Sequence, residues 1–98
     1  MSLSITFRRQ ARHEFDEAAD WYEQRRAGLG TTFVAAVERV LDQAAVNPRR
    51  YAKALEGVHG GLVRGFPYCV YFREEGDQIV VLAVFHASRN PAIWQSRT

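Results

Sequence analysis

The spacing of apolar residues changes twice along this chain, and these two changes limit the folds that it can adopt. Leu3, Ile5 and Phe7 alternate with polar residues, which is the period of two expected of a half-buried strand. From about Arg9 the period lengthens to that of a helix, and after Pro48 it becomes extended again. Helices grouped between strands in this way are typical of an α+β fold.

A first amphipathic helix is predicted from about Arg9. Its apolar side chains recur one turn apart and form a single stripe, which consists of Ala11, Phe15, Ala18 and Tyr22. The segment Gly28-Leu29-Gly30 should stop this helix, because glycine adopts the left-handed cap conformation without steric cost.

A second helix should begin near Thr31 or Thr32, either of which could be its N-cap. Its apolar stripe consists of Phe33, Val37, Val40, Leu41 and Ala44. Asn47-Pro48 should end it, because proline disfavours helix at the residue before it. Two helices with so short a joint are expected to pack as an antiparallel hairpin.

Three strands are predicted after the helices. The stretch from Val58 to Arg64 is the weakest, because two adjacent glycines interrupt it. Tyr68 to Arg73 is rich in aromatic and β-branched residues, and residues 74–77 should form a hairpin loop. Gln78 to His86 is almost fully apolar, so both of its faces should be buried.

These elements predict a single α+β domain over residues 1–98. An N-terminal strand and a two-helix hairpin come before a three-stranded antiparallel meander. The strands should join in one twisted, mostly antiparallel sheet with the helices on one face. The tail from Ala87 to Thr98 is polar, with Pro91 and Trp94 as its anchors.

Composition excludes several classes of protein. No apolar run approaches the roughly 20 residues that cross a bilayer, and no signal peptide is recognised at the N-terminus. Cys69 is the only cysteine, so an internal disulfide is excluded and a cytoplasmic protein without membrane contact is expected. Lys53 is the only lysine among 13 Lys and Arg residues, so arginine carries nearly all the positive charge.

Neither a metal nor a cofactor is expected. His13, His59 and His86 are far apart in sequence and lie in no metal-binding motif. No glycine-rich loop precedes a helix with the spacing that binds a nucleotide. Cys69 lies inside a predicted strand, which favours a packed side chain over a nucleophile.

Arg64, His86 and Arg89 form the most informative polar set, because they lie at or just beyond the ends of two predicted strands. A histidine beside arginines could move a proton and hold a phosphate during RNA cleavage. The spacing alone favours a structural interpretation. In that case Arg64 pairs with an acidic side chain, while His86 and Arg89 fix the start of the C-terminal segment.

The C-terminal half resembles the RelE/ParE superfamily of toxins. The resemblance lies in Arg-Gly-Phe-Pro-Tyr-Cys-Val-Tyr-Phe at 64–72, in Asp-Gln-Ile-Val-Val-Leu-Ala-Val at 77–84, in His-Ala-Ser-Arg-Asn-Pro at 86–91 and in Trp-Gln-Ser-Arg at 94–97. The short strand, the charged helix and the glycine-containing joint of the N-terminal half fit the same family. Asn90 departs from its pattern, because members often carry Asp there.

The resemblance is closer to ParE, of the plasmid stabilisation family, than to RelE, since lysine is nearly absent and no tyrosine follows Tyr71. It implies the toxin component of a type II toxin-antitoxin module that inhibits DNA gyrase and has no catalytic centre of its own. It also implies a cognate antitoxin, ParD-like or of another family. Operator DNA would be bound only through the toxin-antitoxin complex.

Two alternatives remain open. The chain could be a RelE-like, ribosome-dependent mRNA endoribonuclease, with Arg64, His86 and Arg89 as catalytic residues, or an inactive antitoxin-binding module. If it binds gyrase, the expected target-binding residues are Arg64, Arg89, Trp94 and Arg97. The aromatic residues expected to bind the antitoxin are Trp21, Tyr22 and Phe33.

Overall fold

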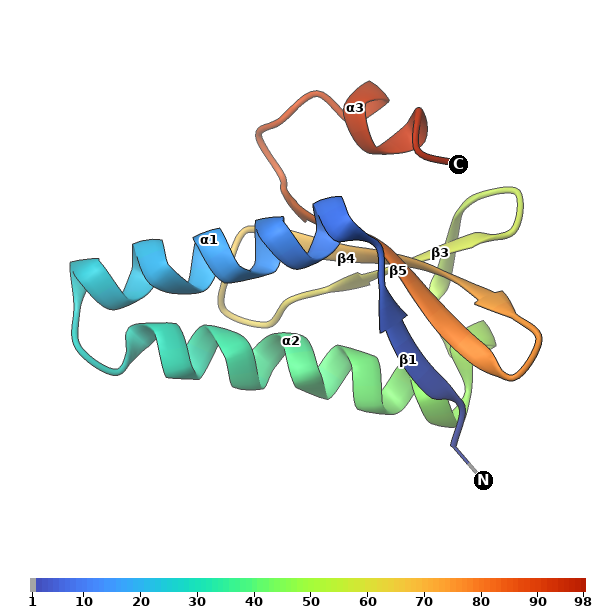
Figure 1. The fold of residues 1–98 in the computed structure, drawn as a ribbon, viewed down its shortest axis with the longest axis horizontal. Helices are drawn as coiled ribbons and strands as arrows, with labels where there is room; N and C mark the ends of the chain where they lie inside the picture. Colours follow the sequence, from blue (N-terminus) through green and yellow to red (C-terminus); the bar gives the residue numbers. More distant parts are fainter. Residues whose placement is uncertain (1) are drawn as a thin grey trace.

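A computed structural model describes residues 2–98, and its elements follow the predicted order with three additions (Figure 1). The elements in chain order are β1 (Ser4–Phe7), α1 (Arg9–Arg25), α2 (Leu29–Val46), a 3-10 turn (Pro48–Arg50), β2 (Ala52–Leu55), β3 (Val58–Leu62), β4 (Tyr68–Glu75), β5 (Gln78–His86) and α3 (Ala92–Gln95). The sequence pattern did not predict the 3-10 turn, the short strand β2 or the one-turn helix α3.

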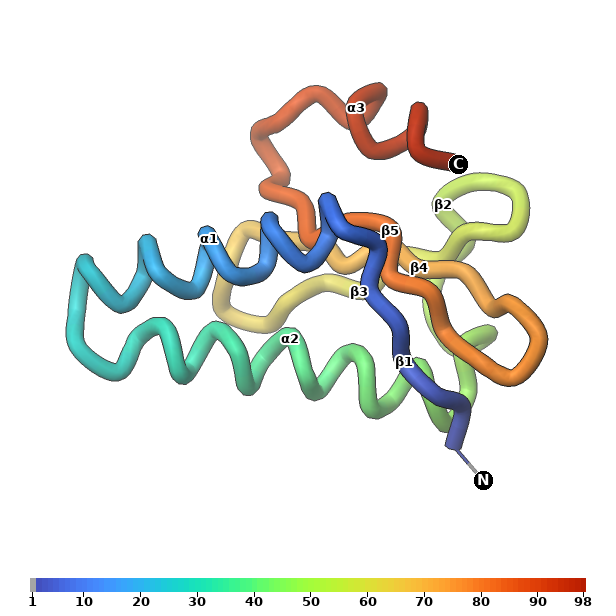
Figure 2. Tube along the Cα trace, in the orientation of Figure 1, coloured from blue at the N-terminus to red at the C-terminus, as the bar shows by residue number. Residues whose placement is uncertain are grey.

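All strands belong to one five-stranded sheet in the order β1-β5-β4-β3-β2 (Figure 2). β1 lies parallel to β5, with Ser4 opposite Gln78 and Phe7 opposite Val81. The other neighbouring strands are antiparallel. The prediction of a mostly antiparallel sheet with the two-helix hairpin on one face is confirmed, and the meander is extended by β2.

β5 is buried on both faces, as its apolar sequence predicted, but it contains a β-bulge at Leu82. Tyr71 lies opposite Ala83 and Phe72 lies opposite Val81, so Leu82 is the extra residue. The bulge changes which side chains face the helices. Ile79, Val81 and Val84 belong to the core beneath α1 and α2, whereas Val80, Leu82, Ala83 and Phe85 face the opposite side.

The joint between the two helices differs from the prediction. α2 begins at Leu29, not near Thr31 or Thr32, and its N-cap is Gly28 with a left-handed φ of 89°. The carboxylate of Glu23 on α1 accepts hydrogen bonds from the backbone N–H groups of Gly28 at 2.9 Å and Gly30 at 3.0 Å. A side chain of the preceding helix thus satisfies N–H groups at the start of α2.

The hairpin between β4 and β5 is tighter than predicted. The loop was expected at residues 74–77, but β4 continues to Glu75 and only Gly76 and Asp77 make the turn. Gly76 has a φ of 59°, and no residue other than glycine has a positive φ among residues 2–98. A glycine at the first position of a two-residue turn fits a type II′ hairpin, which matches the twist of the two strands.

Neither α1 nor α2 combines the length and apolar character that crossing a membrane requires, and this holds for every helix within residues 2–98.

We expect the Gly30→Ala substitution to destabilise the hairpin by about 1–3 kcal/mol, the usual cost of overpacking. A Cβ at position 30 would lie 2.6 Å from the backbone oxygen of Ala19 and 2.9 Å from Glu23. This clash should outweigh the gain in helix propensity of about 1 kcal/mol. Urea unfolding measures the change, with Thr31→Ala on the exposed face as the control. Equal or higher stability of Gly30→Ala would contradict the close packing of the two helices.

Candidate functional site

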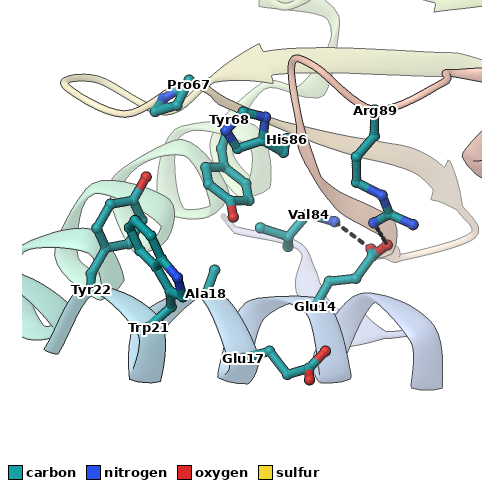
Figure 3. A pocket seen from close by; sticks show the side chains of 10 residues that line it. All are labelled: Glu14, Glu17, Ala18, Trp21, Tyr22, Pro67, Tyr68, Val84, His86 and Arg89. Carbon is teal, nitrogen blue, oxygen red and sulfur yellow. Dashed lines mark hydrogen bonds and ion pairs between the residues drawn. The ribbon is translucent and has the colours of Figure 1, made fainter. Parts of the chain in front are cut away.

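A cleft opens between α1, the start of β4 and the end of β5 (Figure 3). Its volume is about 560 Å³. Ala18, Trp21 and Tyr22 line it from α1, and Tyr68 and His86 line it from the two strands. The cleft exists because β1 reaches only as far as the bulge in β5, so the second half of that strand has no neighbouring strand on this side.

The carboxylate of Glu14 fills part of this uncovered edge. Its Oε1 accepts a hydrogen bond from the backbone N–H of Val84 at 3.1 Å. The Arg97 guanidinium contacts both carboxylate oxygens, at 3.0 and 2.9 Å, and also donates to the carbonyl of Leu82 at 3.1 Å. Arg89 donates to Oε2 at 2.9 Å. One acidic side chain therefore connects α1, β5 and the C-terminal segment.

Burial separates the two arginines that contact Glu14. The side chains of Glu14 and Arg97 are only 11% and 14% exposed, whereas that of Arg89 is 42% exposed. The partly buried pair of Glu14 and Arg97 has a structural role, because each of its members also binds the backbone of β5. Arg89 adds a second positive charge at the rim of the cleft. Whether Arg89 or Arg97 contacts a target, as predicted, stays a prediction.

His86 is held by the turn that follows it. Its Nδ1 lies 3.0 Å from the backbone N–H of Ser88, which can only donate, and 2.8 Å from Ser88 Oγ. Nδ1 is therefore an acceptor, and in the neutral ring this network assigns the proton to Nε2. A ring in this state presents no free lone pair to a substrate. The geometry fits the structural alternative, in which His86 fixes the start of the C-terminal segment.

Arg64 lies outside the cleft. The backbone brings its neighbourhood near His86, because the Val63 N–H donates to the Tyr68 carbonyl at 2.9 Å and Tyr68 lies opposite His86 in the sheet. The Arg64 side chain instead lines an adjoining hollow with Arg26. The three basic residues singled out from the sequence thus share one end of the sheet, but only His86 and Arg89 share the cleft.

Trp94 is buried and joins α3 to the sheet. It is 2% exposed, and its ring stacks on Tyr71 with centroids 3.8 Å apart. Burial of Tyr71 is the main reason that its pKa is raised to about 12. Trp94 is therefore an anchor of the tail, as expected. Its predicted contact with a target is untested, and its buried ring offers little surface for one.

The three aromatic residues expected to bind an antitoxin differ in exposure. Trp21 is 51% exposed, and the Arg25 guanidinium lies 4.2 Å from the centre of its ring. Tyr22 is half-buried and packs against both Phe33 and Phe66. Phe33 is completely buried in the core. Trp21 and Tyr22 are accessible to a partner, whereas Phe33 supports them from below.

Cys69 and the histidines give no sign of other chemistry. Burial raises the pKa of the Cys69 thiol, which disfavours the reactive thiolate. Within residues 2–98, no group of three His, Cys, Asp or Glu side chains is arranged to hold a metal ion.

Sequence reasoning missed Glu14, although the sequence contains a signal for it. Glu14 is three residues after Ala11 and four before Ala18, so it lies along the edge of the apolar stripe of α1. A carboxylate flanked by small buried residues at this spacing indicates a charge that is turned toward the core and needs a partner.

We expect Glu14→Gln to lower the free energy of unfolding by about 3 kcal/mol, because it leaves the partly buried Arg97 without its counter-charge. Glu17→Gln is the matched control, since Glu17 lies one turn further along α1 and pairs only with the exposed His13. Urea unfolding of both variants measures the difference. Similar stabilities for the two variants would show that Glu14 does not hold the edge of β5.

We expect His86→Asn to preserve stability and His86→Gln to lower it by about 1 kcal/mol, the value of one hydrogen bond. An asparagine oxygen lies close to the position of Nδ1 and can still accept from Ser88, whereas a glutamine oxygen lies further out. The toxicity that the resemblance implies should fall only in proportion to the loss of folded protein. Thermal melts and growth assays on both variants test this. A folded but non-toxic His86→Asn variant would instead identify a catalytic histidine.

Two comparisons with known proteins found matches, one to a solved structure and one to a family model. One solved structure, from the chromosomal ParDE TA system of P. aeruginosa, superimposes with a TM-score of 0.74 and 18% sequence identity, over 89% of this chain and 98% of that chain. No curated protein matches the chain. The model of one family, the ParE toxin of the type II toxin-antitoxin system parDE, matches residues 5–91. Because this match spans nearly the whole chain, the protein belongs to the ParE toxin family.

Proposed function

We propose that this ParE-family toxin inhibits DNA gyrase by binding to it, and that a cognate antitoxin holds it inactive. The observation that carries the proposal is the state of His86. Its Nδ1 is committed to Ser88, so the one histidine that lines the cleft has no free acceptor atom for a proton.

RNA cleavage needs more than positive charge. A base must remove the proton of the attacking hydroxyl, and cations must stabilise the phosphate in the same place. In this toxin Arg64 lines a different hollow from His86. This separation supports a binding function over the ribonuclease alternative. The choice of gyrase as the target rests on the resemblance to the ParE branch.

An antitoxin partner is supported by the surface of the cleft. Trp21 is half-exposed beside Tyr22, and large aromatic side chains that face an open cleft are typical of sites that another protein covers. We further propose that the toxin works in the cytoplasm, where gyrase and its DNA are found. It would contact operator DNA only as part of the complex with the antitoxin.

Induction of the toxin in growing bacteria should stop DNA synthesis before protein synthesis and should trap cleaved DNA on gyrase. The purified toxin should inhibit supercoiling by purified gyrase, and co-purified antitoxin should restore it. Arg64→Ala and Arg89→Ala are the first variants to test, because both side chains are exposed and carry charge. Incorporation of radiolabelled thymidine measures DNA synthesis in the cell, and incorporation of radiolabelled methionine measures protein synthesis.

Two other results would favour the alternatives. Cleavage of mRNA in the ribosomal A site, with translation stopping first, would establish the ribonuclease. Normal growth after induction, with antitoxin binding intact, would identify an inactive antitoxin-binding module.

A further inference from the structure

A second hollow lies at the tip of the helical hairpin. It is lined by positively charged side chains and by no acidic ones. Arg26, just after α1, and Arg64, in the loop between β3 and β4, line it together with Leu29, Thr32, Phe66 and other residues. Its volume is about 560 Å³, and none of its lining residues is acidic. Among residues 2–98, neither Arg26 nor Arg64 takes part in an ion pair.

This hollow adjoins the cleft described above. Tyr22 and Pro67 line both, so the two form one continuous surface along the side of α1. At its far end Arg89 shares the Glu14 carboxylate with Arg97. Two guanidinium groups on one carboxylate leave a surplus positive charge there. Because Arg97 is the more buried of the two, the half-exposed Arg89 carries the surplus that a partner could reach.

The middle of the surface is aromatic. Trp21 is half-exposed, Tyr22 and Tyr68 are half-buried, and Pro67 is exposed between the two hollows. In Figure 3 the Trp21 and Tyr22 rings stand on α1 below Pro67 and Tyr68, with the cleft between them. The surface is therefore basic at both ends and apolar in the middle.

We propose that this surface receives a segment of the antitoxin that carries acidic residues at both ends and apolar residues between them. The inference rests on the proposed function, because it takes the antitoxin as the partner. One acidic end would lie against Arg26 and Arg64, and the other against Arg89. Arginine suits carboxylates because its planar fork can bind both oxygens at once.

The exposed Glu17 favours a polypeptide over a nucleic acid as the partner. Glu17 also lines the cleft, and its carboxylate would repel a run of phosphates. A polypeptide can place a neutral side chain opposite it and keep its acids for the two basic ends. The apolar middle also offers area that a partner can bury.

The test uses the toxin and the antitoxin encoded next to it, purified together as a complex. The toxin is then separated, refolded and titrated with the antitoxin, and the titration gives the binding constant. We expect Arg64→Gln, Arg26→Gln and Arg89→Gln each to weaken binding about tenfold, and Trp21→Ala to weaken it by at least as much. Arg49→Gln is the matched control, because Arg49 is exposed and lines neither hollow. Added salt should weaken binding by wild type more than binding by a double Arg26 and Arg64 variant.

The outcomes separate this inference from the proposed function. If the antitoxin binds wild type and all four variants equally, this surface is wrong while the antitoxin partnership stands. If the antitoxin does not bind wild type, both are overturned. If a single-stranded oligonucleotide binds wild type and loses binding on Arg26→Gln or Arg64→Gln, the surface recognises nucleic acid instead. Thermal melts of each variant ensure that only folded proteins are compared.

Discussion

The contact between the Glu14 carboxylate and the uncovered edge of β5 determines the shape of the site. β1 pairs with β5 only from Gln78 to Val81, so the rest of that edge would leave buried backbone groups without partners. Glu14 accepts from the Val84 N–H and Arg97 donates to the Leu82 carbonyl, so two side chains replace a missing strand. The same pair attaches the C-terminal segment, which passes above α1 in Figure 1.

The bulge at Leu82 explains why side chains, and not a longer β1, complete this edge. β5 carries large apolar residues on both faces, and one extra residue changes which of them meet the helices. It also increases the local twist, and β1 ends opposite Val81, just before it. α1 then continues from Arg9 past the second half of β5, and this places Glu14 and Trp21 along the cleft.

The sequence predicted the elements whose signal is periodic and local, and it missed those that depend on distant contacts. The stripes of α1 and α2 and the apolar run of β5 were sufficient to place them. The start of α2 was misplaced because its N–H groups bind Glu23 of another helix, which no local cap signal reveals. Residues 52–55 lack β-branched side chains and become β2 only through pairing with β3. For the site, the predicted strand ends were sufficient to place His86 near Tyr68. The directions of the Arg64 and His86 side chains could not be predicted from the spacing of residues.

Several polar groups of the cleft already have partners within the fold. Its one histidine accepts a hydrogen bond from Ser88, and the Glu14 carboxylate is shared between two arginines. The Arg89 guanidinium and the Trp21 ring are left exposed as guanidinium and aromatic surfaces. Such surfaces bind strongly when a partner removes them from water, because they offer both charge and apolar area. A domain of 98 residues buries only part of its apolar surface in its small core, which leaves the aromatic side chains of the cleft available to a partner.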